Sequence, residues 1–198
     1  MTATEFKSKW IAVGNDILSP FPLEKLEGLN FQKSTIDFFN VSGLPNSSAP
    51  FLSFAKDTND PEDGVILLTK LYDFLEDDYN RFISIGSDGS GNPIALDILD
   101  NDKVVWLDHE DYFKSYYMNS SISTLAQTLL VYRIFISKLL AENGENAVID
   151  CDFTDEQYEN LKQKIIEIDS KALIEENGFW KQEMEMLLTN REYYSTNK

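Results

Sequence analysis

The feature of the sequence that most constrains its fold is a long segment without acidic residues. Residues 112–140 contain three basic residues and no Asp or Glu. From Ser121 onward, apolar side chains recur at helical spacing and cover most of the helix surface, which is typical of a helix buried on all sides. The apolar positions are Ile122, Leu125, Ala126, Leu129, Leu130, Tyr132, Ile134, Phe135 and Ile136. The segment therefore predicts a central helix that lies across a sheet.

Two acidic blocks flank this segment along the chain. Residues 55–111 carry fifteen acidic and four basic residues, and residues 141–188 carry thirteen and four, in a chain of 198 residues whose net charge is −17. Such a charge repels the phosphates of nucleic acids and anionic lipid surfaces. We therefore expect no direct nucleic-acid partner and no membrane partner. The blocks are either ordinary solvated faces or surfaces that bind a cationic partner.

Signals for secretion, membrane insertion, disulfides and metal binding are weak in this chain. The first residues lack the apolar run of a signal peptide, and Gln127, Thr128 and Arg133 interrupt the most apolar stretch. Cys151 is the single cysteine and His109 the single histidine, so we expect neither an internal disulfide nor a His-rich metal site. These observations predict a cytoplasmic protein without a cofactor or a metal.

The middle of the chain has the pattern of short antiparallel strands. Apolar runs bounded by turn residues occur at residues 51–54, 65–68, 81–85, 94–98 and 103–107. The connections between the last three runs are short, as they are between antiparallel neighbours, so we expect a meander. The predicted fold class is α+β: a mainly antiparallel, twisted sheet of about five to six strands with flanking helices and a helical C-terminal extension.

Helix-start signals lie near both ends of the chain. Thr2 with Glu5, and Thr154 with Gln157, have the spacing of a capping box. The first signal predicts a helix that ends near Val13. Further helices are expected at residues 34–40, from residue 154 onward and, as a last short helix, at residues 179–188. We expect a single domain over residues 1–198, with its core at 44–140 and helical extensions at 1–40 and 150–190.

A Gly-rich segment in the meander suggests a nucleotide site at first sight. Gly86, Gly89 and Gly91 are spaced Gly-x-x-Gly-x-Gly, which is not the dinucleotide-binding pattern, and they lead into a strand instead of a helix. A hairpin loop is the simpler interpretation. An enzyme or small-ligand binder that uses this loop with Asp97 and His109 is the least favoured of our hypotheses.

A series of short motifs runs through the same part of the chain. Gly-Leu-Pro occupies residues 43–45, the Gly-rich hairpin residues 85–94, Leu-Asp residues 96–97 and Val-Trp-Leu-Asp-His residues 105–109, and Met-Asn-Ser-Ser follows at 118–121. In this order the motifs resemble those of the SUKH superfamily over residues 44–140. The motif residues to which we assign a structural role are Gly43, Leu44, Pro45, Gly86, Gly89, Gly91, Asn92, Pro93, Asp97, Trp106 and His109.

The SUKH superfamily takes in fungal cell-wall assembly regulators and many bacterial immunity proteins. The resemblance implies a twisted sheet with flanking helices and a binding protein instead of a catalyst. It also implies an immunity protein that neutralises a cognate polymorphic toxin, often a nuclease, inside the producing cell, and the helix at Phe179-Trp180 resembles that of bacterial immunity branches. The alternative is a regulatory scaffold without a toxin partner, as the fungal relatives imply.

The charge of the chain agrees with a basic partner. A nuclease binds phosphates and is usually basic, so an acidic inhibitor is steered to it, while aromatic anchors supply the tight part of the contact. We predict that acidic residues of two loops and the hairpin, with two tyrosines, bind the partner: Asp57, Asp60, Glu62, Asp63, Tyr72, Glu76, Asp77, Asp78, Tyr79 and Asp88. The alternative for the two tyrosines is packing in the core. The sequence does not indicate an oligomeric state.

Overall fold

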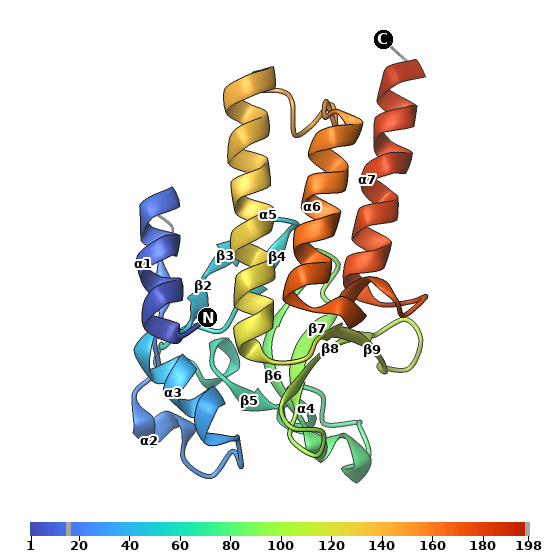
Figure 1. Ribbon diagram of the computed structural model, residues 1–198. Helices are drawn as coiled ribbons and strands as arrows, with labels where there is room; N and C mark the ends of the chain where they lie inside the picture. The colour runs from blue at the N-terminus through green and yellow to red at the C-terminus, as the bar shows by residue number, and fades with distance from the viewer. Residues whose placement is uncertain (15–16, 197–198) are drawn as a thin grey trace.

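The computed structural model describes residues 1–14 and 17–196, and it shows a layer of helices on one side of an antiparallel sheet (Figure 1). The main sheet of the described residues has seven strands: β3 (Ser47–Ser48), β4 (Leu52–Phe54), β5 (Ile66–Leu67), β6 (Phe82–Ser87), β7 (Pro93–Asp97), β8 (Lys103–Asp108) and β9 (Lys114–Asn119). Their order is β3-β4-β6-β7-β8-β9, and β5 also pairs with β6. The predicted α+β class with an antiparallel meander is confirmed.

The strand predictions differ from the structure in three places of the main sheet, the first being the short strand β3, which was not predicted. The predicted run 65–68 is a strand over Ile66–Leu67, and Leu68 already begins the short helix α4 (Leu68–Leu71). The strand β9 was not predicted, because the turn before it lacks Gly, Asn and Pro. Tyr112 and Phe113 take left-handed backbone angles there, with φ of 52° and 55°. Such angles are uncommon for aromatic residues, so the sequence has no ordinary turn signal at this point.

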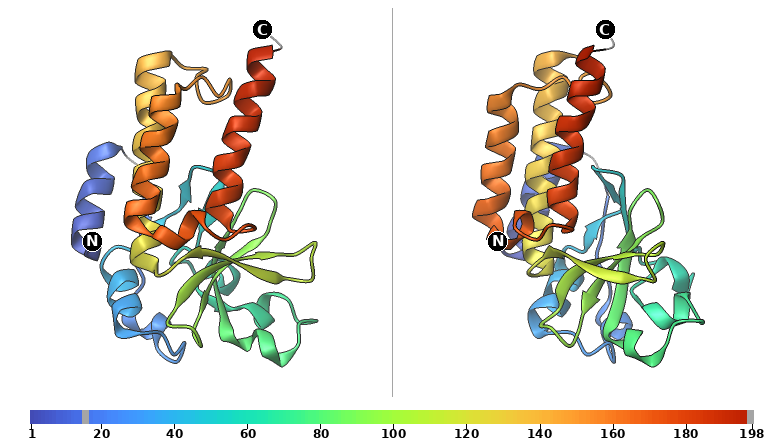
Figure 2. Two further views of the ribbon diagram at one scale, coloured as in Figure 1. Left: turned by 45° about the vertical axis from the view of Figure 1, so that its right-hand side comes forward. Right: turned by 90° about the vertical axis from the view of Figure 1, so that its right-hand side faces the viewer.

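Most of the helices come before or after the meander in the sequence. Before the meander lie α1 (Ala3–Val13), α2 (Leu23–Leu26) and α3 (Lys33–Val41), with the small sheet of β1 (Leu18–Ser19) and β2 (Leu44–Pro45). After it come α5 (Ile122–Asn143), α6 (Asp155–Ile168) and α7 (Phe179–Thr196). The 3₁₀ turns are η1 (Pro61–Asp63), η2 (Asp77–Arg81) and η3 (Ser170–Leu173). Figure 2 shows α5, α6 and α7 standing side by side on the sheet.

The capping signals of the sequence are confirmed, and the length predicted for the last helix is wrong. Capping boxes join Thr2 to Glu5 and Thr154 to Gln157. The helix α7 runs to Thr196 instead of ending near residue 188. Its last turns are anchored by Arg191, which donates to the carbonyl oxygen of Phe153 at 3.1 Å and stacks over the ring of that residue. This anchor lies outside the apolar stripe that the sequence pattern follows.

Helix α5 is the centre of the helical layer, as predicted. Its buried residues include Leu125, Ala126 and Leu129, and it packs against α1, α3, α6 and the strands β8 and β9. A helix of 22 residues is about 33 Å long and a six-residue strand about 20 Å, so only part of α5 lies on the sheet. The rest stands beyond it beside α6 (Figure 1). By length and composition alone α5 could cross a membrane, but its apolar residues supply the core.

Apolar side chains cover both faces of the sheet. On the helical side, Ile94 and Leu96 belong to the large core that includes α5. On the other side, Ala95 and Val105 belong to a smaller core, which the segment around α4 and the loop before β9 cover. Successive side chains of β7 thus alternate between the two cores, although every residue of this strand is buried. The smaller core is therefore the base of a second surface, opposite the helices.

Candidate protein-binding site

The Gly-rich hairpin between β6 and β7 is organised around the carboxylate of Asp88. The Oδ1 atom accepts hydrogen bonds from the backbone N–H groups of Ser90 and Asn92, each at 2.9 Å. The Oδ2 atom accepts one from the Asn92 side chain at 2.9 Å and one from the Trp106 indole at 2.8 Å. Burial alone would raise the pKa of Asp88, but these bonds outweigh it and hold the pKa below its ordinary value.

The side chain of Asn92 extends this network to the loop after β8. Its Oδ1 atom accepts from the backbone N–H of His109 at 3.0 Å and lies 2.6 Å from Nδ1 of the same residue. An amide oxygen only accepts hydrogen bonds, so this contact places the ring proton of His109 on Nδ1. The Asp88 and Asn92 side chains thus hold together the hairpin and the end of β8. The motif residues Asn92, Trp106 and His109 have structural contacts.

Two motif glycines allow backbone segments to approach each other closely. A Cβ atom on Gly43 would lie 1.8 Å from the carbonyl oxygen of Ser19, where β1 pairs with β2, and the residue has a φ of 61°. A Cβ atom on Gly86 would lie 2.2 Å from the carbonyl oxygen of Ser53 in β4. Only glycine fits at either position without a shift of the backbone. Leu44 and Pro45, which follow Gly43, are buried in β2.

The motif carboxylate Asp97 is paired inside the sheet. Its side chain receives a two-pronged contact from Arg81, with Nε donating to Oδ1 at 2.8 Å and Nη2 donating to Oδ2 at 2.6 Å. Asp97 is 3% exposed. The backbone N–H of Leu99 donates to Oδ1 as well. These bonds satisfy a buried charge, so Asp97 stabilises the start of β6 against the end of β7.

A second buried carboxylate, Asp169, joins the sheet to the C-terminal helices. Its oxygens accept from the hydroxyl of Tyr117 at 2.9 Å and from the backbone N–H of Ser120 at 2.6 Å. Beside it, Oδ1 of the motif residue Asn119 accepts from the indole N–H of Trp180 at 2.8 Å. The Met-Asn-Ser-Ser motif therefore connects β9 and the start of α5 to η3 and α7.

The first predicted acidic group, in η1 and the loop before it, is partly neutralised. Lys25 from α2 pairs with Asp57 at 2.5 Å. The Asp60 side chain caps η1, where its Oδ1 accepts from the N–H of Glu62 at 3.0 Å, and Asp63 accepts from Thr58. Glu62 is exposed. Lys25 neutralises one of the four acids, and neutral donors occupy oxygens of Asp60 and Asp63, so the group is less available than its sequence suggests.

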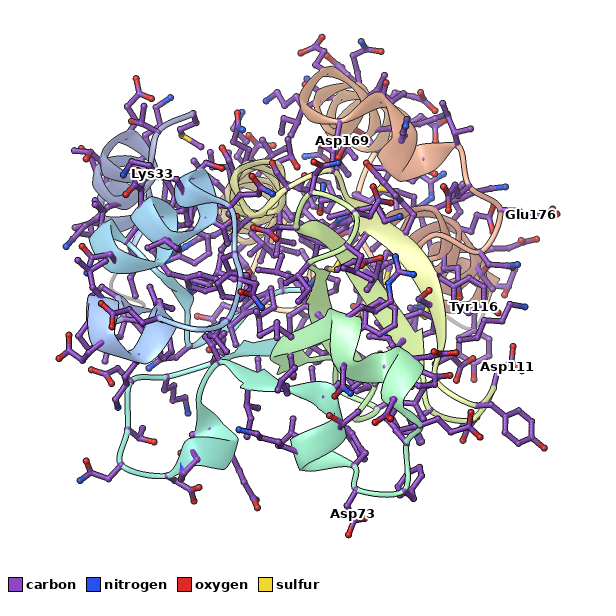
Figure 3. All side chains as sticks on the ribbon, turned by 90° about the horizontal axis from the view of Figure 1, so that it is seen from below. Lys33, Asp73, Asp111, Tyr116, Asp169 and Glu176 are labelled. Atoms are coloured by element: carbon purple, nitrogen blue, oxygen red, sulfur yellow. The ribbon has the colours of Figure 1, made fainter. Side chains whose placement is uncertain are left out.

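The second predicted acidic group lies on the face opposite the helices and is less neutralised. Glu76, Asp77 and Asp78 are exposed, and among the described residues no basic side chain pairs with any of them. Asp73 is also exposed, and Figure 3 shows it pointing away from the sheet, as does Asp111 from the neighbouring loop. Lys114 approaches Asp111 at 3.6 Å, so that residue is partly neutralised.

Exposed aromatic rings lie among these acids. Phe74 is 70% exposed. Its ring packs beside those of Phe113 and Tyr72, with centroid distances of 5.8 Å to Phe113 and 6.0 Å to Tyr72. Tyr112 is 87% exposed, and its carbonyl oxygen accepts a 2.8 Å hydrogen bond from the hydroxyl of Tyr79. We call this region the acid–aromatic surface. Its members are Tyr72, Asp73, Phe74, Glu76, Asp77, Asp78, Tyr79, Glu110, Asp111 and Tyr112.

The predicted anchors Tyr72 and Tyr79 support this surface more than they project from it. Tyr72 is half-buried against Phe113, with ring centroids 4.7 Å apart, and burial raises the pKa of its hydroxyl. Tyr79 is half-buried beside Phe82. The sequence interpretation missed Phe74 and Tyr112, the rings that do project. One signal in the sequence could have identified them. Phe74 lies within a run of acidic residues and Tyr112 directly follows one, and neither belongs to a periodic apolar pattern that would predict burial.

The family of the chain is settled by its sequence match. The model of the SUKH-4 immunity protein family matches residues 12–188. The chain belongs to this SUKH-4 family. No curated protein and no solved structure matches the chain. The match reaches well beyond the predicted core at 44–140: it begins near the end of α1 and ends in the middle of α7, so it takes in most of the helical extensions.

Membership in the SUKH-4 family gives the chain an immunity role and implies a cognate toxin as its partner. The resemblance stated from the motifs is thereby confirmed. Within the described part of the chain, no group of three or more His, Cys, Asp or Glu side chains could hold a metal ion.

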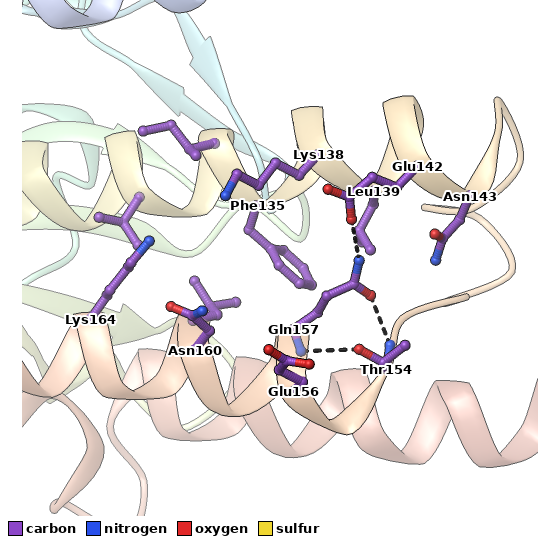
Figure 4. A pocket seen from close by; sticks show the side chains of 13 residues that line it. Phe135, Lys138, Leu139, Glu142, Asn143, Thr154, Glu156, Gln157, Asn160 and Lys164 are labelled. Carbon is purple, nitrogen blue, oxygen red and sulfur yellow. Dashed lines mark hydrogen bonds between the residues drawn. The ribbon is translucent and has the colours of Figure 1, made fainter.

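This SUKH-4 protein also has a groove between α5 and α6, of about 410 Å³ (Figure 4). Its apolar base includes Phe135 and Leu161, and Lys138 and Lys164 stand on its rim. Gln157 closes one end, where its Nε2 donates to Glu142 at 2.8 Å and its Oε1 accepts from the backbone N–H of Thr154 at 2.8 Å. Because its rim carries charges of both signs, the groove selects a cationic partner less clearly than the acid–aromatic surface does.

Proposed function

We propose that this immunity protein neutralises a basic nuclease domain of its toxin by direct binding through the acid–aromatic surface, in the cytoplasm of the producing cell. The observation that carries the proposal is the exposure of Phe74 and Tyr112 close to Glu76, Asp77 and Asp78, three exposed acids with which no basic side chain of the described residues pairs. Rings that are exposed in the free protein and rest on a packed base are the usual anchors of a tight protein interface.

The charge of the surface supports a basic partner. Acidic patches attract a cationic protein over distances of about 10 Å and raise the association rate most at low salt. A nuclease carries cations where it holds phosphates, so its substrate face is complementary to a chain of net charge −17. An inhibitor that covers this face blocks the substrate, and it needs no catalytic group of its own.

The experiment is to purify the toxin encoded beside this protein and to measure both its binding and its activity. We expect the protein to inhibit the toxin at equimolar concentration and to bind it with an affinity that falls as salt rises from 50 to 300 mM, conditions in which Debye screening increases. Absence of binding, or binding without inhibition, would contradict the proposal.

A charge-reversal variant tests the surface itself. In the variant Glu76→Lys, Asp77→Lys, Asp78→Lys, we expect the association rate to fall by at least about tenfold at low salt, because attraction becomes repulsion. The matched control is Glu156→Lys, Glu159→Lys, Glu167→Lys, which changes the net charge equally at three exposed positions of α6. If both variants slow association equally, only the net charge matters and this surface is not the binding site.

A further inference from the structure

A pocket of about 410 Å³ lies where the first half of α7 faces the Gly-rich hairpin. Its lining includes Asp88 and Asn92 from the hairpin, Trp106 from β8, and Phe179, Glu183 and Met186 from α7. The segments are far apart in sequence, and the fold brings them together because Trp106 bonds to Asp88 and packs near Phe179, with ring centroids 6.3 Å apart. The pocket lies outside the acid–aromatic surface.

The carboxylate of Glu183 faces this pocket without a partner. Within the described residues it has neither a hydrogen bond nor an ion pair, and its neighbour across the pocket is the Asp88 carboxylate, which has the same sign. Burial, and to a lesser degree the charge of Asp88, raises the pKa of Glu183 to about 7. Ionising Glu183 in this position is unfavourable in free energy, and a cation placed between the two carboxylates would offset that unfavourable term.

The remaining charged groups near the pocket do not supply that cation. On α7 itself, Lys181 pairs with Glu185 at 3.9 Å, and Glu185 stands exposed on the rim. On the loop after β8, the ring of His109 is directed to Asn92. The pocket therefore has a net negative charge, two aromatic rings in its wall and a free carboxylate.

These features select among cations. The oxygens of Asp88 each accept two hydrogen bonds already, so Glu183 alone offers free lone pairs and a metal ion would lack ligands. A guanidinium group suits the site better. It donates two parallel hydrogen bonds to one carboxylate, it stacks on an indole ring and it is weakly hydrated, whereas an ammonium group is a strongly hydrated point charge.

We propose that this pocket binds the guanidinium group of an arginine side chain presented by the toxin. The carboxylate of Glu183 accepts two hydrogen bonds from it, the ring of Trp106 contacts its flat face, and Asp88 contributes charge without a direct bond. This inference rests on the proposed function for its partner, but the pocket's preference for guanidinium can be measured without the toxin.

The test uses the three indole N–H signals of the ¹⁵N-labelled protein. A hexa-arginine peptide should shift the signal of Trp106, while those of Trp10 and Trp180, which lie in the core, should stay in place. A hexa-lysine peptide of equal charge should shift it much less. In Glu183→Gln we expect at least about tenfold weaker binding of the arginine peptide, because a charge-assisted pair is lost. Glu185→Gln, on the exposed rim of the same helix, should change it by less than about twofold.

Results that overturn the pocket are distinct from results that overturn the proposed function. Equal shifts with both peptides, or unchanged arginine-peptide binding in Glu183→Gln, would overturn the pocket even if the toxin binds. If the arginine peptide binds as expected and Glu183→Gln leaves the affinity for the toxin unchanged, the assignment of the occupant is wrong. If the toxin does not bind the wild-type protein at all, the proposed function fails, and the peptide result stands by itself.

Discussion

The indole N–H of Trp106 donates a 2.8 Å hydrogen bond to Oδ2 of Asp88, eighteen positions earlier in the chain. This bond ties the hairpin between β6 and β7 to the strand β8, which pairs with β7 from the other side. Asp88 is therefore the point at which two separate sequence motifs of this SUKH-4 protein meet. Its charge is held by neutral donors alone: Ser90, Asn92 and Trp106.

Replacing Asp88 should destabilise the fold. We expect Asp88→Ala to lower the free energy of unfolding by about 2–4 kcal/mol, because four donors lose their acceptor. Water cannot fully replace this acceptor for the donors that are half-buried. Urea unfolding at pH 7 measures the change. The control is Asp73→Ala, an exposed acid for which we expect less than about 0.5 kcal/mol. An Asp88 effect as small as that of Asp73 would show that the network does not hold the hairpin.

Acid should have the same effect as the substitution. The folded-state pKa of Asp88 is below its ordinary value, so the folded protein binds fewer protons here than the unfolded chain does. The stability that Asp88 contributes is thus fully present above its ordinary pKa of 3.8 and is lost as the pH falls through the lower, folded-state value. Unfolding curves of wild type and Asp88→Ala should converge toward low pH, and parallel pH dependences would contradict this.

The pair of Arg81 and Asp97 should be sensitive to the loss of its cation. In Arg81→Met, the Asp97 carboxylate stays buried without its ion pair, and we expect a loss of about 3 kcal/mol in the free energy of unfolding. Lys103→Met removes the cation of a more exposed pair with Asp100 and should cost less than about 1 kcal/mol. Equal costs in chemical denaturation would show that burial of Asp97 adds nothing to this interaction.

Structure that depends on residues close together in the sequence was predicted well. Structure that depends on unusual backbone angles or on contacts between distant residues was not. The capping boxes at Thr2 and Thr154 were readable because both partners lie within three positions. The strand β9 was missed because Tyr112 and Phe113 form its turn with backbone angles that sequence rules reserve for Gly and Asn. The two-residue strand β3 was missed as well, so five of the seven strands that the structure describes in the main sheet correspond to predicted runs.

The candidate sites show the same division. The acids at 76–78 were recognised as a charged group, and the structure leaves them exposed. Asp88 has the same chemistry in the sequence, yet its oxygens are occupied by donors up to eighteen positions away. The unpartnered carboxylate of Glu183 could not be recognised at all, because its isolation depends on how α7 packs against the hairpin. Composition identifies charges, and tertiary packing decides which of them remain available.

The pH dependence of stability should report the environment of Glu183. Burial, and to a lesser degree the charge of Asp88, raises its pKa from the ordinary value of 4.5 to about 7 in the folded state. Between these two pH values Glu183 is therefore ionised in the unfolded chain but still largely protonated in the folded protein. Wild type therefore loses stability as the pH rises through this window, and the neutral variant Glu183→Gln does not. We expect the variant to be more stable at pH 8 by about 1–3 kcal/mol and similar at pH 4.

Urea unfolding of both proteins at several pH values measures this difference. Glu185→Gln is the matched control, because its side chain is exposed on the same helix and should follow wild type. The same difference between wild type and Glu183→Gln at pH 4 and pH 8 would show that Glu183 is as easily ionised in the folded protein as in the unfolded chain.

Truncation of Phe74 should separate binding from stability. Its ring is 70% exposed and rests on the rings of Tyr72 and Phe113, so Phe74→Ala should change the free energy of unfolding by less than about 1 kcal/mol. As an interface anchor, however, it should account for a loss of about 10- to 100-fold in affinity for the toxin. The loss should lie in the dissociation rate and change little with salt, because the ring carries no charge.

The matched control is Ile174→Ala, since Ile174 is also 70% exposed but lies on the turn before α7, away from the acid–aromatic surface. Its toxin affinity should stay within about twofold of wild type. Surface-immobilised kinetics at two salt concentrations distinguish the anchor from the acids, because charge reversal at Glu76, Asp77 and Asp78 acts on the association rate. If Phe74→Ala and Ile174→Ala bind the toxin equally well, the rings of this surface do not anchor the complex and attraction between charges alone must account for its binding.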